Sequence, residues 1–315
     1  MAEKMATRVA YGEALLELGK ENENIVVIDA DLCACTKTDL FAEAFPDRYF
    51  NLGIAESNMV GVAAGLATCG KIAIANSFAM FSAGRAFEQI RNSVAYPNLN
   101  VKIVGTHAGL SVGKDGATHQ CLEDIGVLRT VPNMTILCPA DSVETYHAFK
   151  AAIEHEGPVY LRLGRLPVDT VNDNDDYHFE LGKGILMKPG SDLTIVTTGL
   201  MLQEALAARE ELLAEGIEAR IVHIPTIKPL DEEIIVKAAE ETGLVITAEE
   251  HNIMGGLGSA VAEVLAEQCP VRMRRIGTND VFGKSGEPHD LMREYGLDAA
   301  TIVKVAKEEF RKKQG

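Results

Sequence analysis

The sequence predicts an α/β protein of two domains, each with a mostly parallel β-sheet and helices on both faces. A length of 315 residues suits about two domains of ordinary size. The composition, 47% hydrophobic but only 5% aromatic, is typical of α/β proteins rich in Ala, Val and Ile. Continuous apolar runs recur between helical stretches, and strands that are buried on both faces of a parallel sheet have this pattern.

The first domain is expected over residues 1–171 and begins with an amphipathic helix at 7–19. Five buried strands are expected at 25–29, 71–75, 101–105, 134–138 and 159–163, and further helices at 57–68, 82–96, 121–128 and 142–155. Asp31, Phe78 and His107 each come just after one of these strands. Because ligands of a parallel sheet gather at the carboxyl ends of its strands, we expect these three side chains to share a crevice.

A polar, acidic segment without periodicity predicts a linker, which we place over residues 172–180. The second domain, residues 181–315, repeats the alternation of strands and helices on a smaller scale. Its strands are expected at 193–197, 219–223, 244–249 and 271–276, and its helices at 203–215, 231–242, 257–268 and 299–310.

The net charge narrows the class of binding partner, and the cysteine spacing bears on metal binding and on the redox state of the thiols. Lys and Arg number 30 against 46 Asp and Glu, a net charge of −16, so nucleic acid and anionic membranes are disfavoured. A phosphate site must then be a local cluster of arginines. The six cysteines lack the paired spacing of a metal site, which predicts reduced thiols. We expect a cytoplasmic protein, because the first helix is unlike a signal peptide and no apolar run reaches about 18 residues.

One carboxylate, Glu56, precedes a helix of small apolar residues. By spacing alone, it is best explained as a charge that favours the helix dipole. Phe78 and Phe81 follow the next strand, and such a pair, taken alone, is more often part of the core. The glycine-rich segment 106–120 adds two histidines and an aspartate, which suggests recognition of hydroxyl and carbonyl groups.

Four segments of the chain resemble the C-terminal half of transketolase, the thiamine-diphosphate enzyme of sugar-phosphate metabolism. They are FNLGIAESNM, SFAMF, THAGLSVGKDGATHQ and EEHNIMGGLGSAVAE, in this order. The resemblance runs from about residue 6 to about residue 307, nearly the whole chain. It implies the pyrimidine-binding domain of transketolase followed by the transketolase C-terminal domain.

The resemblance implies that Glu56 binds the aminopyrimidine of thiamine diphosphate. A carboxyl group in a dry site would favour the imino tautomer, whose nitrogen removes the proton from the thiazolium carbon. Phe78 and Phe81 are similar to the aromatic wall around the pyrimidine, with Phe81 the more direct contact. Asp31 is placed with them in the cofactor site.

The remaining site residues would bind the sugar. His119, counted with Glu56 as catalytic, resembles the residue near the donor carbonyl, and Asp115 resembles the one that binds a hydroxyl. His107 is similar to a residue near the phosphate. Arg8 matches a phosphate-binding arginine of the family. A second such arginine is either Arg162 or Arg165, and the sequence does not decide between them.

Three departures from the family concern the substrate more than the cofactor. Cys35 and Thr36 stand where the family has a serine that contacts phosphate. Gly84 followed by Arg85 stands where many relatives have a third aromatic residue. Lys114 replaces a common acidic residue before Asp115.

The metal and diphosphate half of a transketolase site is missing. The family holds a divalent metal with an Asp and an Asn from a Gly-Asp-Gly motif and the chain that follows it. No Gly-Asp-Gly occurs in the sequence, so we expect no metal ligand in this chain. An N-terminal subunit carrying that motif would supply Mg²⁺ or another divalent metal, and an α2β2 assembly would be active where this chain alone is not.

Other readings remain open. Deoxyxylulose-phosphate synthase and the beta subunit of a 2-oxoacid dehydrogenase have the same two domains. Arg85 favours the synthase, whereas the loop GKDGATHQ disfavours the dehydrogenase, which needs no hydroxyl recognition. A transketolase for another pentulose phosphate is equally compatible. A non-catalytic scaffold is disfavoured because Glu56, Phe78, Phe81 and His119 are all present.

Overall fold

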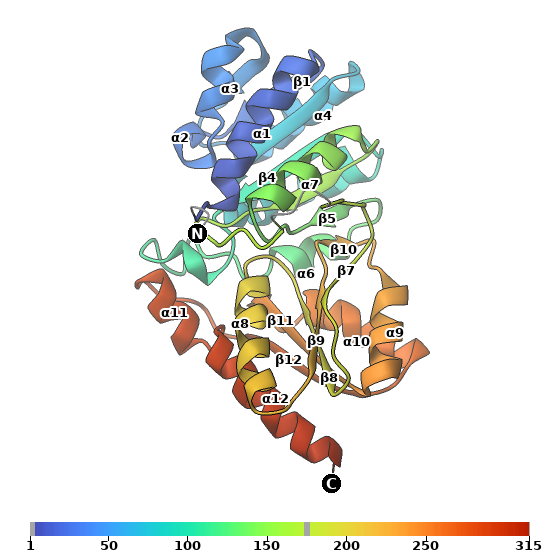
Figure 1. The fold of residues 1–315 in the computed structure, drawn as a ribbon. Helices are drawn as coiled ribbons and strands as arrows, with labels where there is room; N and C mark the ends of the chain where they lie inside the picture. Colours follow the sequence, from blue (N-terminus) through green and yellow to red (C-terminus); the bar gives the residue numbers. More distant parts are fainter. Residues whose placement is uncertain (1–3, 173–176, 315) are drawn as a thin grey trace.

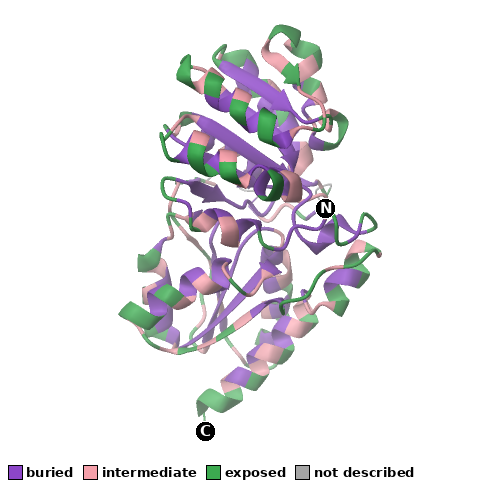
Figure 2. Ribbon diagram, turned by 180° about the vertical axis from the view of Figure 1, so that it is seen from behind, coloured by how far each residue is buried: buried purple, intermediate pink, exposed green. Residues whose placement is uncertain are grey.

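The computed structural model describes residues 4–172 and 177–314, and it has two stacked α/β units (Figure 1). The first unit lies above the second in this view, and the long last helix leads to the C-terminus. The central strands of both sheets are buried, while the outward faces of the helices are exposed (Figure 2). The expected class, two α/β domains with mostly parallel sheets, is confirmed.

The first sheet has seven strands within the described residues, in the order β10-β5-β6-β4-β3-β1-β2. Neighbouring strands are parallel except β10, which is antiparallel to β5. Their bounds are β1 Ile25–Asp29, β2 Tyr49–Asn51, β3 Ile72–Phe78, β4 Val101–Thr106, β5 Thr135–Leu137, β6 Val159–Arg162 and β10 Thr226–Lys228.

Helices cover both faces of this sheet and form two separate cores. Helices α1 (Thr7–Glu21), α3 (Asp39–Ala44) and α7 (Ser142–Glu154) contribute to one core. Helices α4 (Glu56–Thr68) and α6 (Asp124–Arg129) contribute to the other. Short helical segments complete the unit: α2 Cys33–Thr36, α5 Phe87–Gln89 and the 3₁₀ turns Pro46–Arg48 and Leu110–Val112.

The expected helix at 82–96 is not a regular α-helix. It consists of the π-helical segments Met80–Arg85 and Ile90–Ala95, separated by the short helix α5. A π-turn takes up an extra residue and changes the direction of the side chains around it, often at a functional site. A Cβ at Gly84 would meet only the terminal methyl group of Met80, which a rotation of that flexible side chain could move away.

The second sheet has the order β12-β11-β8-β9-β7, with β7 antiparallel to β9 at its edge. Helices α8 and α12 contribute to the core on one face, and α9 and α10 to the core on the other. The bounds are β7 Ile185–Lys188, β8 Leu193–Thr197, β9 Ala219–His223, β11 Leu244–Asn252, β12 Arg272–Thr278, α8 Met201–Ala214, α9 Glu232–Thr242, α10 Leu257–Gln268, α11 Pro288–Glu294 and α12 Ala299–Gln314.

The two units are joined by a shared β-sheet and by buried polar contacts as well as by the linker. Strand β10 lies beyond the expected boundary at 172–180 but pairs with β5 of the first sheet. Buried polar groups also cross the junction, since Glu144 of α7 contacts His223 of β9 at 2.7 Å and accepts a hydrogen bond from Tyr177. Residues 173–176 of the expected linker, and residues 1–3 and 315 of the expected domains, lie outside the described residues.

No helix in the described ranges combines the length and apolar character that a bilayer span requires.

Candidate active site

Strands β4, β3 and β1 are adjacent in the first sheet. Their carboxyl ends bring His107, Phe78 and Asp31 to the same end of the sheet. Asp31 has a left-handed backbone, with φ of 63°, and its loop is closed by Asn51. The Asn51 Nδ2 donates to Asp31 Oδ1 at 3.1 Å, and the Asp31 N–H donates to Asn51 Oδ1 at 3.1 Å. The three residues therefore lie at the same end of the sheet, and the crevice that they are expected to share stays a prediction.

Aromatic rings form the centre of this edge. Phe78 stacks on His107 with ring centroids 3.9 Å apart, and its centroid is 5.7 Å from that of Phe81. His119 meets Phe81 edge-on at 5.2 Å. The two Phe residues thus pack on histidines at the end of a strand. If they were ordinary core residues, aliphatic side chains would surround them instead.

His107 is a neutral imidazole at physiological pH. It is buried, with φ of 56°, and its Nδ1 lies 2.9 Å from the hydroxyl of Thr106. Burial first, and then the positive charges of Arg8 and Arg165, lower the pKa of His107 to about 3. The same two charges make this end of the crevice attractive to an anion.

Glu56 begins α4 and is 4% exposed. Arg85, from the end of the first π-segment, donates from Nη1 to Glu56 Oε1 at 2.9 Å. The guanidinium of Arg85 also lies over the Phe81 ring, 4.0 Å from its centroid. The buried carboxylate, the cation and the aromatic ring are therefore in direct contact.

The other end of the crevice carries two arginines. Arg8, in the first turn of α1, donates from Nη1 to the Cys35 carbonyl at 2.6 Å. Arg165 donates to the Val112 carbonyl at 2.9 Å and pairs with Asp115 at 3.3 Å, with both side chains partly exposed. Burial lowers the pKa of Arg8, and the positive charge of Arg165 contributes to this. The two cations thus lie within electrostatic range of each other.

Arg162, the alternative to Arg165, has its partners inside the protein. Its Nε donates to the fully buried Asp124 at 2.8 Å, and its Nη2 donates to the Glu250 carbonyl at 2.9 Å. Tyr160 donates to the same carboxylate of Asp124 at 2.7 Å. The guanidinium of Arg162 is 6% exposed and joins the two domains.

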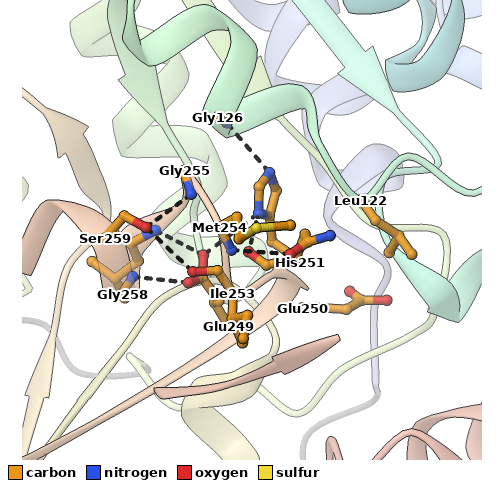
Figure 3. A network of polar contacts seen from close by, with 12 residues as sticks. Leu122, Gly126, Glu249, Glu250, His251, Ile253, Met254, Gly255, Gly258 and Ser259 are labelled. Carbon is orange, nitrogen blue, oxygen red and sulfur yellow. Dashed lines mark hydrogen bonds and ion pairs between the residues drawn. The ribbon is translucent and has the colours of Figure 1, made fainter. Parts of the chain in front are cut away.

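A polar network that the sequence left without a role surrounds the end of β11 (Figure 3). Glu249 accepts from the N–H groups of Leu257 and Gly258 at the start of α10, at 2.7 and 2.8 Å. The Gly126 N–H donates to His251 Nε2 at 3.3 Å. The motif EEHNIMGGLG therefore holds α10 and α6 against this strand end.

Glu250 anchors the glycine-rich loop. Its Oε1 accepts from the Ser111 N–H at 2.5 Å, and burial raises the pKa of Glu250 to about 7. A Cβ at Gly109 would overlap this carboxyl group, so the loop needs glycine there. The second domain thus positions the loop that carries Asp115 and His119.

A cleft of about 820 Å³ opens between the domains beside these residues. Its lining comes from the segments 80–85, 117–123 and 280–283 and from Asn252, and it includes Phe81, Arg85, Thr118, Gln120, Asp280 and Phe282. No group of three His, Cys, Asp or Glu residues in the described part of the chain is arranged to hold a metal ion.

The sequence profile of the transketolase pyrimidine-binding domain matches residues 3–169, and that of the transketolase C-terminal domain matches residues 182–302. The chain belongs to the transketolase family. A putative transketolase C-terminal section from Methanocaldococcus jannaschii is 52% identical over 307 residues, covering 97% of this chain and 96% of the relative. A 6-deoxy-6-sulfo-D-fructose transketolase subunit from Clostridium sp. (strain MSTE9) is 44% identical over 306 residues, covering 97% and 95%.

A solved structure, described as an inactive beta4 tetramer of a split-gene transketolase, is 53% identical. It superposes with a TM-score of 0.91, covering 98% of this chain and 99% of that one. The expected family and the expected C-terminal transketolase subunit are confirmed by these comparisons.

Transketolase family membership implies dependence on thiamine diphosphate, and the residues present fit its aminopyrimidine. Glu56 is a buried carboxylate that pairs with a half-exposed arginine, and the same arginine lies over the Phe81 ring. A dry carboxyl group next to an aromatic face suits a flat ring with a hydrogen-bonding nitrogen.

The structure brings together most of the residues chosen from the sequence. Glu56, Phe78, Phe81, His107 and His119 form one cluster, and Arg8, Arg165 and Asp115 lie at its edge. Arg162 lies apart, on Asp124. Sequence reasoning missed the contact of Arg85 with Glu56 and the anchoring role of Glu250. The only signals were the departure at Arg85 and the acidic pair in EEHNIMGG.

Proposed function

We propose that this chain transfers a two-carbon ketol unit between sugar phosphates, in a site completed by an N-terminal transketolase subunit. The observation that carries the proposal is the buried Glu56 carboxylate beside Phe81, with two histidines on the same aromatic cluster. A non-catalytic scaffold would not need a buried carboxylate there, because burying a charged group costs free energy even when a half-exposed arginine pairs with it.

Thiamine diphosphate, when bound, would supply a thiazolium carbon that is nucleophilic toward a carbonyl once it has lost its proton. Glu56 holds a proton at its carboxyl group toward the pyrimidine nitrogen, and Phe78 and Phe81 exclude water from that hydrogen bond. The Asp31 loop closes the crevice on the side of β1. His119 and Asp115 bind the oxygen atoms of the sugar, with His119 at the reacting end.

Arg8 and Arg165, with neutral His107, bind the phosphate of the sugar. Their charges act together on His107, so both are close to the same volume. We assign Arg162 a structural role, because its donors are engaged by Asp124 and by backbone carbonyls in the interior. Asp115 pairs with Arg165 and keeps this arginine at the mouth of the crevice.

The diphosphate and its metal must be held from outside these 315 residues, since the sequence contains no Gly-Asp-Gly motif. We propose a partner subunit with that motif, Mg²⁺ or another divalent metal bound there, and an α2β2 assembly in the cytoplasm. The family, and the description of a 53% identical protein as a split-gene transketolase, support this division.

A donor with a different anionic end is a second candidate, favoured by one observation. Cys35 replaces the serine that contacts phosphate in the family, and its carbonyl is occupied by Arg8. A relative 44% identical to this chain is named for a sulfonated sugar. Comparison of kcat/KM for xylulose 5-phosphate and 6-deoxy-6-sulfo-D-fructose distinguishes the two candidates.

The deciding experiment mixes the purified chain with a partner chain that carries Gly-Asp-Gly, thiamine diphosphate and Mg²⁺. We expect ketol transfer from xylulose 5-phosphate to ribose 5-phosphate only in the mixture. The controls are each chain alone and a mixture that contains Glu56→Gln. Full activity of this chain by itself would refute the split site, and no activity with any phosphorylated or sulfonated ketose would refute the proposed reaction.

A further inference from the structure

Arg85 contacts both groups that we assign to the aminopyrimidine. Its Nη1 donates to Glu56 Oε1 at 2.9 Å, and its guanidinium carbon lies 4.0 Å from the centroid of Phe81. A guanidinium is planar and carries hydrogen-bond donors at its edge. It thereby offers the buried carboxylate a hydrogen bond and the aromatic ring a flat face, as an aminopyrimidine would.

The backbone of Arg85 is anchored, whereas its side chain is half-exposed. The hydroxyl of Ser57 donates to the Arg85 carbonyl at 3.1 Å, which ties the end of the π-segment to α4. The Arg85 side chain is 51% exposed, whereas that of Glu56 is 5% exposed. The cation can therefore swing out toward the cleft, which it also lines, while the carboxylate stays in place.

The charge of Arg85 explains why Glu56 tolerates burial before any cofactor is bound. A buried carboxylate without a partner is costly, and neither the Ala55 N-cap nor another side chain bonds it in the described structure. The guanidinium occupies one carboxylate oxygen of Glu56 and one face of Phe81. An aminopyrimidine held by the same carboxyl group against the same ring would need that space, so the two arrangements exclude each other.

We propose that Arg85 is a placeholder for the aminopyrimidine: it occupies the pyrimidine site of the empty chain and must leave Glu56 and Phe81 before the cofactor can bind. This inference rests on the proposed function. Arg85 is a positioning residue, and its departure couples cofactor binding to a change of partner at Glu56. The apparent affinity for the cofactor is reduced by the fraction of molecules in which Arg85 is seated.

The test compares Arg85→Met with the assembled wild-type protein. Methionine keeps an unbranched apolar chain but removes the cation. The matched control is Arg91→Met, which removes an exposed arginine from the neighbouring π-segment, where its side chain contacts only Asn92 among the described hydrogen bonds. Titration calorimetry with Mg²⁺ present measures binding of thiamine diphosphate and, separately, of 4-amino-5-hydroxymethyl-2-methylpyrimidine.

Arg85→Met should bind both ligands more tightly, by about threefold to tenfold, because a half-exposed ion pair and a cation–π contact no longer compete. Arg91→Met should bind as the wild type does. In a Glu56→Gln background the gain from Arg85→Met should largely disappear, since the competition acts through Glu56. Without cofactor, Arg85→Met should also melt at a lower temperature than Arg91→Met, and saturating cofactor should remove that difference.

Weaker binding by Arg85→Met would overturn the inference and make Arg85 a permanent wall of the pyrimidine site. Unchanged binding would also overturn it. If the wild-type assembly binds neither ligand, the proposed function fails together with the inference. If the wild type binds the ligands tightly and Arg85→Met binds them more weakly or equally well, only the placeholder role of Arg85 is refuted and the proposed function stands.

Discussion

The backbone N–H of Ser111, in the first domain, donates a 2.5 Å hydrogen bond to the carboxyl group of Glu250 in the second. This contact ties the loop of Asp115 and His119 to the end of β11. Burial raises the pKa of Glu250 from its ordinary value near 4.5 to about 7, which makes the contact sensitive to pH. A folded-state pKa above the unfolded value means that the folded protein binds the proton more tightly, so this contribution to stability is complete below about pH 4.5 and is lost as pH rises through 7.

Glu250→Gln should remove that pH dependence. The amide is neutral at every pH, so the free energy of unfolding of the variant should fall less than that of the wild type between pH 5 and pH 7. Urea unfolding at several pH values measures the difference, with Glu240→Gln, an exposed substitution on α9, as the control. Parallel pH profiles for Glu250→Gln and the wild type would contradict the assignment.

Glu56→Gln should assemble with the partner subunit but fail to activate the cofactor. Glutamine keeps the size and a hydrogen bond but cannot share the proton, and loss of a positioned acid–base group costs about 10²–10⁴-fold in rate. Hydrogen–deuterium exchange at the thiazolium carbon of the assembled protein measures this directly. Glu13→Gln, on the exposed side of α1, is the control. Exchange at the wild-type rate would mean that Glu56 is only a charge at a helix terminus.

Arg8→Ala and Arg165→Ala should raise KM for phosphorylated sugars by about tenfold to a hundredfold, because a charge-assisted hydrogen bond contributes about 1.5–3 kcal/mol. Hydroxypyruvate, a donor without phosphate, should be affected little. Steady-state kinetics with both donors measures the ratio. Equal losses for the two donors would show that these arginines support the fold and not the phosphate.

Arg162→Ala should act on stability. Its removal leaves Asp124 buried without its cation, and breaking a buried pair in this way costs about 3–5 kcal/mol. Chemical denaturation is the measurement, and Arg165→Ala, whose side chain is 41% exposed, is the matched control with a small expected effect. A stable Arg162→Ala variant with a phosphate-specific rise in KM would reverse the roles that we assign to the two arginines.

The sequence predicted best those elements whose apolar runs end at clear turn signals. The strands at 25–29, 193–197 and 219–223 and the helix at 257–268 have the expected bounds. The π-segments in 80–95 were missed because an inserted turn leaves the helical pattern nearly unchanged. Strand β10 was missed because three residues before a proline carry too little periodicity to predict a strand.

Site residues could be predicted where a sequence motif identifies them. Their roles could not be predicted where a contact with a residue far away in the sequence decides the role. Arg162 and Arg165 lie three residues apart in YLRLGRLP, and only the fold puts Asp124 beside the first and Asp115 beside the second. The pairing of Arg85 with Glu56 likewise joins residues 29 positions apart on different elements. Neither contact has a local signature.

Strand β10 has a consequence for how the chain reaches its native state. The edge of β5 is closed by Thr226–Lys228, which are synthesised after the whole first domain and after three strands of the second. During synthesis, or in a fragment cut near residue 172, β5 presents unpaired backbone groups to any other strand. The first domain is therefore prone to edge-to-edge association until the second domain has folded onto it, and a fragment that ends there needs a covered edge to remain monomeric.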